Sequence, residues 1–470
     1  MNTQDFFILL RQELCLALLV FILLFMKLGK ERANQTVIVV INILLLINFI
    51  VGLLPAGEGS LFSGMFHTNK LIVLQKNVLN LAFLLISFQA YDWLKGHKHV
   101  AEFYMLLLSA MLGMFFMISS GHLLMFYLGL EMSTIPLAAA VNFDLQRRRS
   151  SEAAMKMIIS SAFSSALLLL GISFVYGATG TLSFAELPAV VNAQPLQLFA
   201  FILLLSGFAF KISAVPFHFW TADVYEGAPV PVTAFLSVVS KAAVMFVFVT
   251  ALYSVFKPLA DAWYAMLVIL SLVTIIVGNL FALRQQNIKR FLAFSSIAQV
   301  GFILVGLSGS SKESGAAVIY FIVVYVFSNL AAFGVVSIVA ALTNQEQIDH
   351  YKGFYRNNKF PSWTLTIALF SLAGVPPAAG FFGKFFLLMA GASRGNYVFI
   401  AVAALNMVIS FYYYLRIVKA MFMDETDTPM PALKLALFPR LALGICLLGI
   451  IVAGVWSCVY EYIFSLSPAF

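Results

Sequence analysis

Four ionisable side chains lie near the middle of long apolar stretches, where charged groups are rare. They are Glu131 in FYLGLEMSTIPLAAA, Lys211 in GFAFKISAVPFHFW, Lys241 in FLSVVSKAAVMFVFV and Lys384 in VPPAAGFFGKFF. On insertion scales each charge costs ~2.5–3.5 kcal/mol at the centre of a bilayer, so such residues face the protein interior, pair with one another or line water. Burial disfavours the ammonium form of a lysine and a nearby carboxylate restores it. The pattern therefore suggests a switchable proton site.

Glu131 is the only acid that we expect at mid-depth, so it is the natural partner of one of the three lysines. One alternative is a static buried ion pair that only fixes helix packing. Three lysines and one acid do not balance in charge, which favours a role in proton movement over the static pair.

Prolines interrupt two of the same stretches. Pro216 cannot donate to the carbonyl of Ile212, and Pro376 and Pro377 likewise free the carbonyls four residues before them. Open backbone at membrane depth is tolerated where it meets protein or water. A hydrated helix break beside a lysine is suited to a proton path.

The elements that carry these residues must be membrane helices. Of the 470 residues 62% are hydrophobic and 10% are charged, with a mean hydropathy of +0.97, whereas about a quarter of a soluble domain is charged. Continuous apolar runs predict an all-α polytopic membrane protein with about 14 transmembrane helices and exclude a barrel. The excess of positive charge is scattered between the runs, so we expect no nucleic-acid partner.

Basic residues concentrate in alternate loops. Of the 28 Lys and Arg, one set of loops holds 17 and the opposite set holds five. The larger set comprises Lys27, Lys30, Arg32, Lys95, Lys98, Arg147, Arg148, Arg149, Arg284, Lys289, Arg290, Lys352, Arg356, Lys359, Lys419, Lys434 and Arg440. The positive-inside rule places this set in the cytoplasm and both termini outside. Lys76, Lys156 and Arg416 lie near helix ends, and we expect them to snorkel to the interface.

The order of the spans predicts an internal repeat. Residues 1–100 form a three-helix segment, 101–255 a first five-helix repeat, 256–420 an inverted second repeat and 421–470 a C-terminal helix. The fourth helix of each repeat carries the mid-membrane prolines. Paired broken helices in inverted halves indicate an ion or substrate pathway.

Other candidate sites are weaker. His218 follows Pro216 and is suited either to passing protons from bulk water or to local packing. His97 and His99 lie in a basic loop beside Glu102, and we expect them to be solvated or lipid-facing. The three cysteines lack CxxC spacing, and no P-loop, GxGxxG or hydrolase triad occurs. We therefore expect no metal, nucleotide, flavin or iron–sulfur site in this chain.

Longer motifs resemble a known family. The stretches HLLMFYLGLEMSTIPLAAA, GFAFKISAVPFHFWTADVYEGAPVPVTAFLSVVSKAAV, NIKRFLAFSSIAQVGF and LAGVPPAAGFFGKFF are similar to the antiporter-like membrane subunits of respiratory complex I. The resemblance implies that Glu131, Lys211, Lys241 and Lys384 are the proton-translocating residues. Family members often carry histidine where this chain has Gln299, so we expect a water-mediated link there.

The resemblance also implies a function. It implies one proton channel of a redox-driven NADH:quinone oxidoreductase in a bacterial inner membrane. NADH, FMN, iron–sulfur clusters and quinone would bind partner subunits, and the other membrane-arm subunits would be neighbours. Protons would move from Lys241 through Gln299 to Lys384, with Glu131 and Lys211 modulating Lys241. The alternative is a component of a multisubunit cation/proton antiporter.

Overall fold

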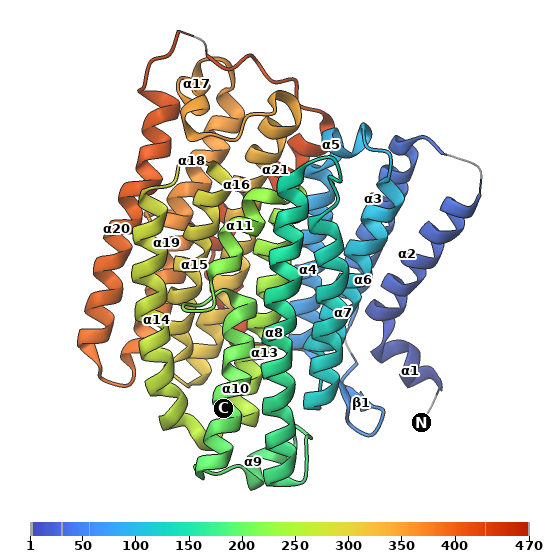
Figure 1. The fold of residues 1–470 in the computed structure, drawn as a ribbon, viewed down its shortest axis with the longest axis vertical. Helices are drawn as coiled ribbons and strands as arrows, with labels where there is room; N and C mark the ends of the chain where they lie inside the picture. The colour runs from blue at the N-terminus through green and yellow to red at the C-terminus, as the bar shows by residue number, and fades with distance from the viewer. Residues whose placement is uncertain (1–2, 30–31, 56, 428, 469–470) are drawn as a thin grey trace.

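The computed structural model describes residues 3–29, 32–55, 57–427 and 429–468, and helices packed side by side make up nearly all of it (Figure 1). Backbone groups find no water in a hydrocarbon core, so the apolar runs form helices that satisfy their own hydrogen bonds. Within the described ranges, twelve helices are long and apolar enough to cross a membrane. This confirms the prediction of an all-α polytopic membrane protein.

The N-terminal part consists of four long helices and a small hairpin. Its elements are α1 (Thr3–Leu9), α2 (Arg11–Leu28), α3 (Asn34–Leu53), β1 (Gly59–Leu61), β2 (Phe66–Thr68), α4 (Lys70–Gln89), α5 (Tyr91–Lys95) and α6 (Val100–Ile118). The two strands pair antiparallel, with Ser60 opposite His67.

The middle of the chain holds the first helix break. Its elements are α7 (Leu123–Val141), α8 (Arg148–Thr179), α9 (Leu187–Val190), α10 (Pro195–Ile212), α11 (Phe219–Gly227), α12 (Val230–Phe235), a π-helical turn η1 (Leu236–Ser240), α13 (Lys241–Thr250), a second π-helical turn η2 (Ala251–Val255) and a 3₁₀ turn η3 (Lys257–Leu259). The segments from α12 to η2 form one continuous span, Val230–Val255.

The last part holds the second break. Its elements are α14 (Ala260–Leu283), α15 (Ile288–Leu307), α16 (Lys312–Thr343), a 3₁₀ turn η4 (Ile348–Tyr351), α17 (Phe354–Asn357), α18 (Lys359–Ala373), α19 (Ala379–Ala392), α20 (Tyr397–Phe422), α21 (Leu437–Val455) and α22 (Cys458–Leu466).

Burial separates central spans from peripheral ones. The most apolar windows of Val230–Val255 and Ile288–Leu307 are each 94% buried, and that of Lys312–Thr343 is 89% buried. The corresponding windows of Tyr397–Phe422 and Leu437–Val455 are only 33% buried. Polar groups on the three central spans are therefore screened from lipid by other helices.

The first break separates α10 from α11. Ser213 adopts a left-handed conformation (φ 65°) at the end of α10, and the amide of Ala214 donates to the carbonyl of Ala209 at 2.8 Å. Pro216 lies in the connection, after a cis peptide bond. The amide of Val215 donates to the hydroxyl of Thr274 on α14 at 3.0 Å, so a neighbouring helix satisfies the opened backbone.

The second break, between α18 and α19, has the same construction. Gly374 is left-handed (φ 86°), and the amide of Val375 donates to the carbonyl of Phe370 at 3.0 Å. In both breaks a left-handed residue and a six-to-one hydrogen bond close the helix, as in the Schellman motif. The bond between Pro376 and Pro377 is also cis.

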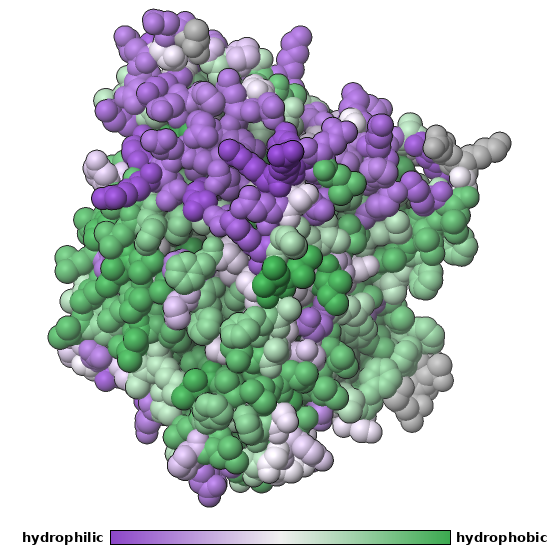
Figure 2. All heavy atoms as spheres, in the orientation of Figure 1, coloured by the Kyte–Doolittle hydropathy of each residue, from purple (hydrophilic) through white to green (hydrophobic). Residues whose placement is uncertain are grey.

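Polar residues cover one end of the molecule. Figure 2 shows hydrophilic side chains over the end that carries α17 and α5 in Figure 1, and mostly hydrophobic side chains along the flanks. The elements α1, β1 and α9 lie toward the opposite end. A hydrophobic flank below a charged cap is typical of a protein that spans a bilayer.

Candidate functional site

Lys241 lies on the continuous, largely buried span that follows the first break. Its side chain is 3% exposed, and its Nζ donates to Ser296 Oγ on α15 at 2.8 Å. The same Nζ lies 5.4 Å from the centre of the Tyr225 ring, on α11. A π-helical turn directly precedes the lysine, and such turns are frequent at functional sites.

Gln299 continues the polar path along α15. It lies three residues after Ser296, so both side chains share one face of the helix. Gln299 Nε2 donates to the Tyr414 hydroxyl at 3.0 Å and to the Leu372 carbonyl at 2.8 Å. Tyr414 also hydrogen-bonds to Ser295 Oγ at 2.5 Å. These exchangeable groups connect α15 to the second helix break.

Lys384 lies on the other side of that break. Its side chain is fully buried on α19, its Nζ donates to the Ala373 carbonyl at 3.2 Å, and the Phe302 ring lies 4.7 Å away. Pro376 and Pro377 have no backbone N–H, so they cannot donate a hydrogen bond to the carbonyls of Leu372 and Ala373, four residues before them. Gln299 and Lys384 therefore bind the two carbonyls that the prolines release.

Glu131 and Lys211 lie near each other but do not touch. Lys211 Nζ donates to Thr134 Oγ1 at 2.7 Å, and Thr134 is one turn beyond Glu131 on α7. Glu131 Oε1 accepts a short hydrogen bond from the Ser165 hydroxyl of α8. No ion pair within 4.0 Å joins Glu131 and Lys211 in the part of the chain that the structure describes. The two charges are instead linked through α7.

Glycines set the position of Glu131 by letting α6 and α7 approach closely. A methyl group on Gly129 would lie 2.7 Å from the backbone nitrogen of Met117, and one on Gly113 would lie 2.6 Å from that of Ser133. Real side-chain carbons do not approach backbone atoms so closely. The two glycines thus fix the distance between the helices, and with it the position of the glutamate.

His218 is buried beside the first break. Its side chain is 6% exposed and its ring packs on Phe219, with 4.5 Å between centroids. Its Nδ1 has no hydrogen-bond partner among the described residues. The structure gives it no direct contact with the lysines, so both interpretations from the sequence stay open.

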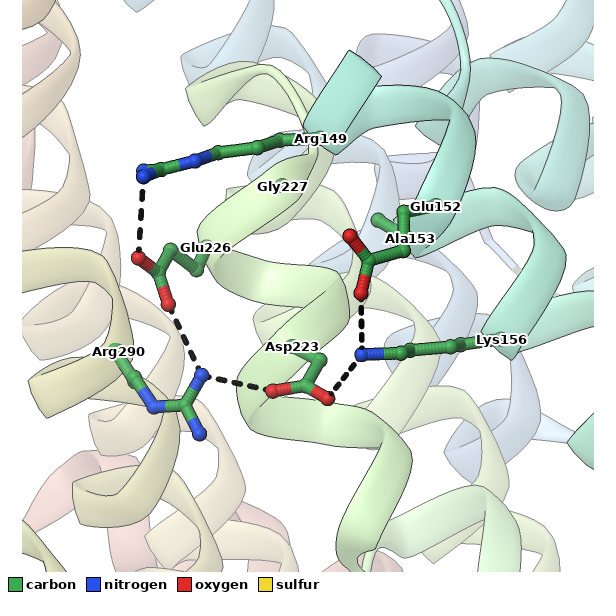
Figure 3. A pocket seen from close by; sticks show the side chains of 8 residues that line it. All are labelled: Arg149, Glu152, Ala153, Lys156, Asp223, Glu226, Gly227 and Arg290. Atoms are coloured by element: carbon green, nitrogen blue, oxygen red, sulfur yellow. Dashed lines mark hydrogen bonds and ion pairs between the residues drawn. The ribbon is translucent and has the colours of Figure 1, made fainter.

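A charged cluster at the polar end was not predicted from the sequence. Acids on α11 alternate with bases on α8 and α15 around a cavity of about 220 Å³ (Figure 3). Arg290 Nη1 contacts Asp223 at 2.7 Å and Glu226 at 3.0 Å, and Lys156 Nζ contacts Asp223 and Glu152 at 2.7 Å each. The cluster joins the half-helix after the first break to two of its neighbours.

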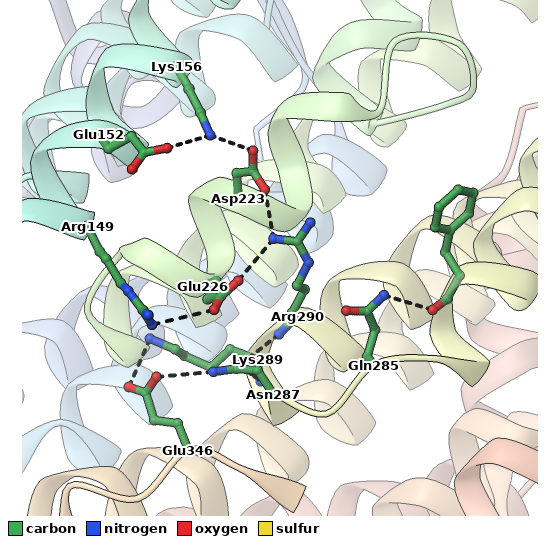
Figure 4. Close-up of polar contacts among 11 residues, drawn as sticks. Arg149, Glu152, Lys156, Asp223, Glu226, Gln285, Asn287, Lys289, Arg290 and Glu346 are labelled. Atoms are coloured by element: carbon green, nitrogen blue, oxygen red, sulfur yellow. Dashed lines mark hydrogen bonds and ion pairs between the residues drawn. The ribbon is translucent and has the colours of Figure 1, made fainter.

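Figure 4 shows that the cluster extends to the loop after α16. Arg149 contacts Glu226 at 3.7 Å, and Lys289 Nζ contacts Glu346 at 3.0 Å and donates to the Ala228 carbonyl at 3.2 Å. The feature of the sequence that could have indicated this cluster is the pair of acids in TADVYEGAP, which lie one helical turn apart. Their partners lie more than 60 residues away in the sequence.

The cluster keeps one of its acids charged. Burial raises the pKa of the Asp223 carboxyl, but the hydrogen bonds from Lys156 and Arg290 outweigh it and hold the pKa below its ordinary value. Asp223 is therefore a carboxylate at neutral pH.

One prediction about charges was wrong. Lys76 does not snorkel: it is 1% exposed and forms an ion pair with Glu13, which is 2% exposed. Glu13 lies in the first turn of α2, so it is a second buried acid, near a helix end and not at mid-depth. The other two bases lie at helix ends as predicted, where Arg416 donates to the carbonyls of Leu283 and Gln285, each at 2.7 Å.

Within residues 3–29, 32–55, 57–427 and 429–468, no three His, Cys, Asp or Glu side chains gather where they could hold a metal ion.

Comparison with known proteins places these features in a family. The sequence family described as "NADH:quinone oxidoreductase/Mrp antiporter, TM" matches residues 120–410, which include all four ionisable residues of the predicted path. The chain is 45% identical to NADH-quinone oxidoreductase subunit N of Phocaeicola vulgatus over 89% of both chains. It is 39% identical to NAD(P)H-quinone oxidoreductase subunit 2 of a Synechococcus strain, over 77% of this chain and 70% of that one.

Solved structures have the same fold. A chain of respiratory complex I from Thermus thermophilus superposes with a TM-score of 0.82 at 29% identity, covering 96% of this chain and 98% of that one. A chain of the Mrp complex from Dietzia sp. superposes with a TM-score of 0.85 at 18% identity, covering 98% and 95%. The second match shows the fold alone.

Proposed function

Because this chain belongs to the NADH:quinone oxidoreductase/Mrp antiporter family of membrane proteins, we propose that it is a proton-translocating membrane-arm subunit of a NADH:quinone oxidoreductase. The identity of 45% to a protein named subunit N supports the assignment to that complex. The observation that carries the mechanism is the buried polar path from Lys241 to Lys384, in which Gln299 and Lys384 bind the carbonyls freed by two prolines.

Protons move along this path between two lysines. A proton on Lys241 is next to the Ser296 hydroxyl, and Gln299, Tyr414 and water continue the route to Lys384. Hydroxyl groups donate and accept hydrogen bonds, so they pass a proton without holding net charge.

Glu131 and Lys211 act on Lys241 through charge. Lys211 bonds to Thr134, one turn from Glu131, so a small rotation of the lysine brings it to the carboxylate. The carboxylate of Glu131 offsets the charge of Lys211 when the two pair, which reduces the repulsion that the Lys211 ammonium group exerts on Lys241. Movement of one lysine thereby changes how readily the other holds its proton.

The predicted architecture belongs to the same proposal. Two spans join the twelve long apolar helices to make fourteen: α2, and the broken span of α18 and α19. Helices α6 to η2 (Val100–Val255) form the first repeat, expected at 101–255, and α14 to α20 (Ala260–Phe422) form the inverted one, expected at 256–420. Three parallels support this pairing: glycine contacts between α6 and α7 and between α14 and α15, the 32-residue helices α8 and α16, and the two matched breaks.

Location and partners follow from the assignment. The basic end faces the cytoplasm of a bacterium, both termini lie on the periplasmic side of the inner membrane, and further antiporter-like subunits flank the chain. NADH, FMN, iron–sulfur clusters and quinone bind to other subunits of the complex.

The test removes the charges that modulate the path. In inverted membrane vesicles we expect Lys211→Met and Glu131→Gln to abolish most NADH-driven proton uptake. Asp349→Asn is the matched control, because this acid lies on the surface in an exposed pair with Lys352. Full proton uptake at normal NADH oxidation in both Lys211→Met and Glu131→Gln would exclude the proposed role.

The second candidate is a component of a multisubunit cation/proton antiporter, which the description of the matching family, naming the Mrp antiporter, supports. Such a protein runs on an ion gradient without electron donors. Co-purification distinguishes the two: flavin and iron–sulfur partners indicate the oxidoreductase, and sodium-dependent exchange without them indicates the antiporter.

A further inference from the structure

Six polar residues that are not part of the four-residue path form a buried group of their own. This N-terminal polar cluster comprises Gln12 and Glu13 on α2, Asn48 on α3, and Lys76, Asn77 and Asn80 on α4. All six residues are at most 5% exposed. None of them lies within the segment that matches the family.

The cluster contains a charged pair surrounded by aromatic rings. Lys76 Nζ bonds to Glu13 Oε1, and the rings of Phe66 and Phe115 have their centres 5.0 and 5.8 Å from that nitrogen. Phe66 belongs to β2 and is fully buried. The pair is therefore held in place and covered by the hairpin at the end of the molecule that bears β1.

Amide side chains continue from the pair along α3 and α4. Asn48 Nδ2 donates to Asn80 Oδ1 at 3.0 Å. A methyl group on Gly52 would lie 2.3 Å from Asn77 Oδ1 and 2.6 Å from Gln12 Nε2, so these two amides converge on the glycine. Three helices thus direct polar groups into one small volume.

Hydrogen bonding inside the cluster is incomplete. Five buried atoms have no hydrogen-bond partner within the described residues: Gln12 Nε2, Glu13 Oε2, Asn48 Oδ1, Asn77 Oδ1 and Asn80 Nδ2. A buried polar atom without a partner costs about 1–3 kcal/mol. Donors and acceptors are both present, which suits water, because a buried water makes about three hydrogen bonds to such groups.

The pair lies close to one face of the membrane. Lys76 is six residues into α4, about 9 Å along the helix axis from its start. Glu13 is in the first turn of α2. Arg11, nearer the surface, donates to the carbonyls of Leu54 and Pro55 at 2.6 and 2.9 Å. A proton leaving the pair has a short distance to bulk water.

We propose that the N-terminal polar cluster is a hydrated proton-exchange site, separate from the Lys241–Lys384 path. The N–H bond of Lys76 breaks as an O–H bond forms on Glu13, which leaves a neutral amine and a carboxylic acid. Bound water then takes the proton from Glu13, and a second proton from water restores Lys76. No oxidant or reductant is needed. The contribution of this site to pumping rests on the proposed function, whereas its hydration does not.

The first experiment measures hydration with cysteine probes. In an assembled complex whose Cys15, Cys446 and Cys458 are replaced by serine, Asn48→Cys and Leu45→Cys are treated with a small membrane-permeant hydrophilic thiol reagent. Leu45 is fully buried and lies three residues before Asn48 on α3.

We expect Asn48→Cys to react roughly tenfold faster, the equivalent of about 1.4 kcal/mol. Asn77→Cys gives the same comparison if the Asn48 variant does not assemble. Equal rates for the cluster variant and for Leu45→Cys would mean a dry cluster and would overturn the proposal.

The second experiment separates proton release from packing. Lys76→Arg keeps the positive charge beside Glu13, but arginine does not lose its proton in proteins. We expect an assembled complex with normal NADH oxidation and fewer protons moved per NADH. The double variant Glu13→Gln with Lys76→Met, which removes both charges, should give the same loss.

Unchanged proton yield in an assembled variant would overturn the transport role of the cluster. Failure of the proposed function is distinguishable, because the chain would then not co-purify with flavin and iron–sulfur partners. The exposed ion pair of Asp349 and Lys352 provides the matched control, because Lys352→Arg should leave the proton yield unchanged.

Discussion

Replacing Gln299 by leucine tests the central link of the proposed proton path. The glutamine Nε2 is bonded to the Tyr414 hydroxyl and to the Leu372 carbonyl, and its residue is fully buried. Leucine has similar size and no polar atom, so it removes both hydrogen bonds while it fills most of the space. The carbonyl that Pro376 released then has no side-chain donor, at a cost of about 1–3 kcal/mol.

The effect on transport is larger than the effect on packing. A charge that crosses an apolar segment at mid-membrane costs ~2.5–3.5 kcal/mol on insertion scales, and each 1.4 kcal/mol is a factor of ten. We therefore expect proton transfer between Lys241 and Lys384 to slow by roughly 10²-fold in Gln299→Leu. Gln299→His should retain transfer, because a neutral imidazole offers one donor and one acceptor.

The assay compares proton uptake with NADH oxidation in inverted vesicles that contain equal amounts of assembled complex. Loss of uptake in Gln299→Leu, with retention in Gln299→His, is the expected pair of results. Uptake in the leucine variant at the wild-type ratio to NADH oxidation would refute the path through this residue.

Three further outcomes follow from other features. Lys241→Arg and Lys241→Met should reduce NADH-driven proton uptake equally, because arginine keeps the charge but releases no proton; uptake by the arginine variant would contradict this. Gly129→Ala places a carbon 2.7 Å from the Met117 backbone and should destabilise the α6–α7 contact by about 1–3 kcal/mol. Immunoblots should show less chain in the membrane than for Gly444→Ala, whose added carbon meets nothing within 4 Å, and equal amounts would refute the close contact. Because the pKa of Asp223 is lowered, its carboxylate contributes to folding stability at every pH above the ordinary pKa of about 3.9. This contribution is lost only as the pH falls through the lowered pKa. The Tm difference between the purified wild-type complex and Asp223→Asn should therefore stay constant from pH 8 to 5, and a decrease within that range would contradict the assignment.

The sequence was sufficient to predict the spans and the breaks. A continuous apolar run of membrane length forms a helix in lipid, because a helix satisfies its own backbone hydrogen bonds. A proline within it leaves the carbonyl four residues earlier without its helical hydrogen bond. The prediction that Pro376 and Pro377 free two carbonyls followed from the missing N–H of proline, and the structure shows which side chains bind those carbonyls. The identity of those side chains depended on the packing of α15 and α19, which local sequence does not specify.

Charge pairing was harder to predict. Lys76 lies near a helix end, where snorkelling and burial are equally compatible with the sequence, and its partner Glu13 is 63 residues away. The contacts of Asp223 with Lys156 and Arg290 each span 67 residues. The π-helical turn before Lys241 has no sequence signature, since it depends on how neighbouring helices fill the space around it.

The alternating charges around Figure 3's cavity also make one part of the molecule sensitive to ionic strength. Asp223 and Arg290 are about one-third exposed, so dissolved ions screen their contact, and the Debye length is already ≈ 8 Å in physiological salt. The Lys241 contact with Ser296 is out of reach of such ions. Added salt will therefore weaken the contact between Asp223 and Arg290, while Tyr225 of the same half-helix stays beside Lys241. The half-helix thus combines one contact that depends on the electrolyte with one that dissolved ions do not reach.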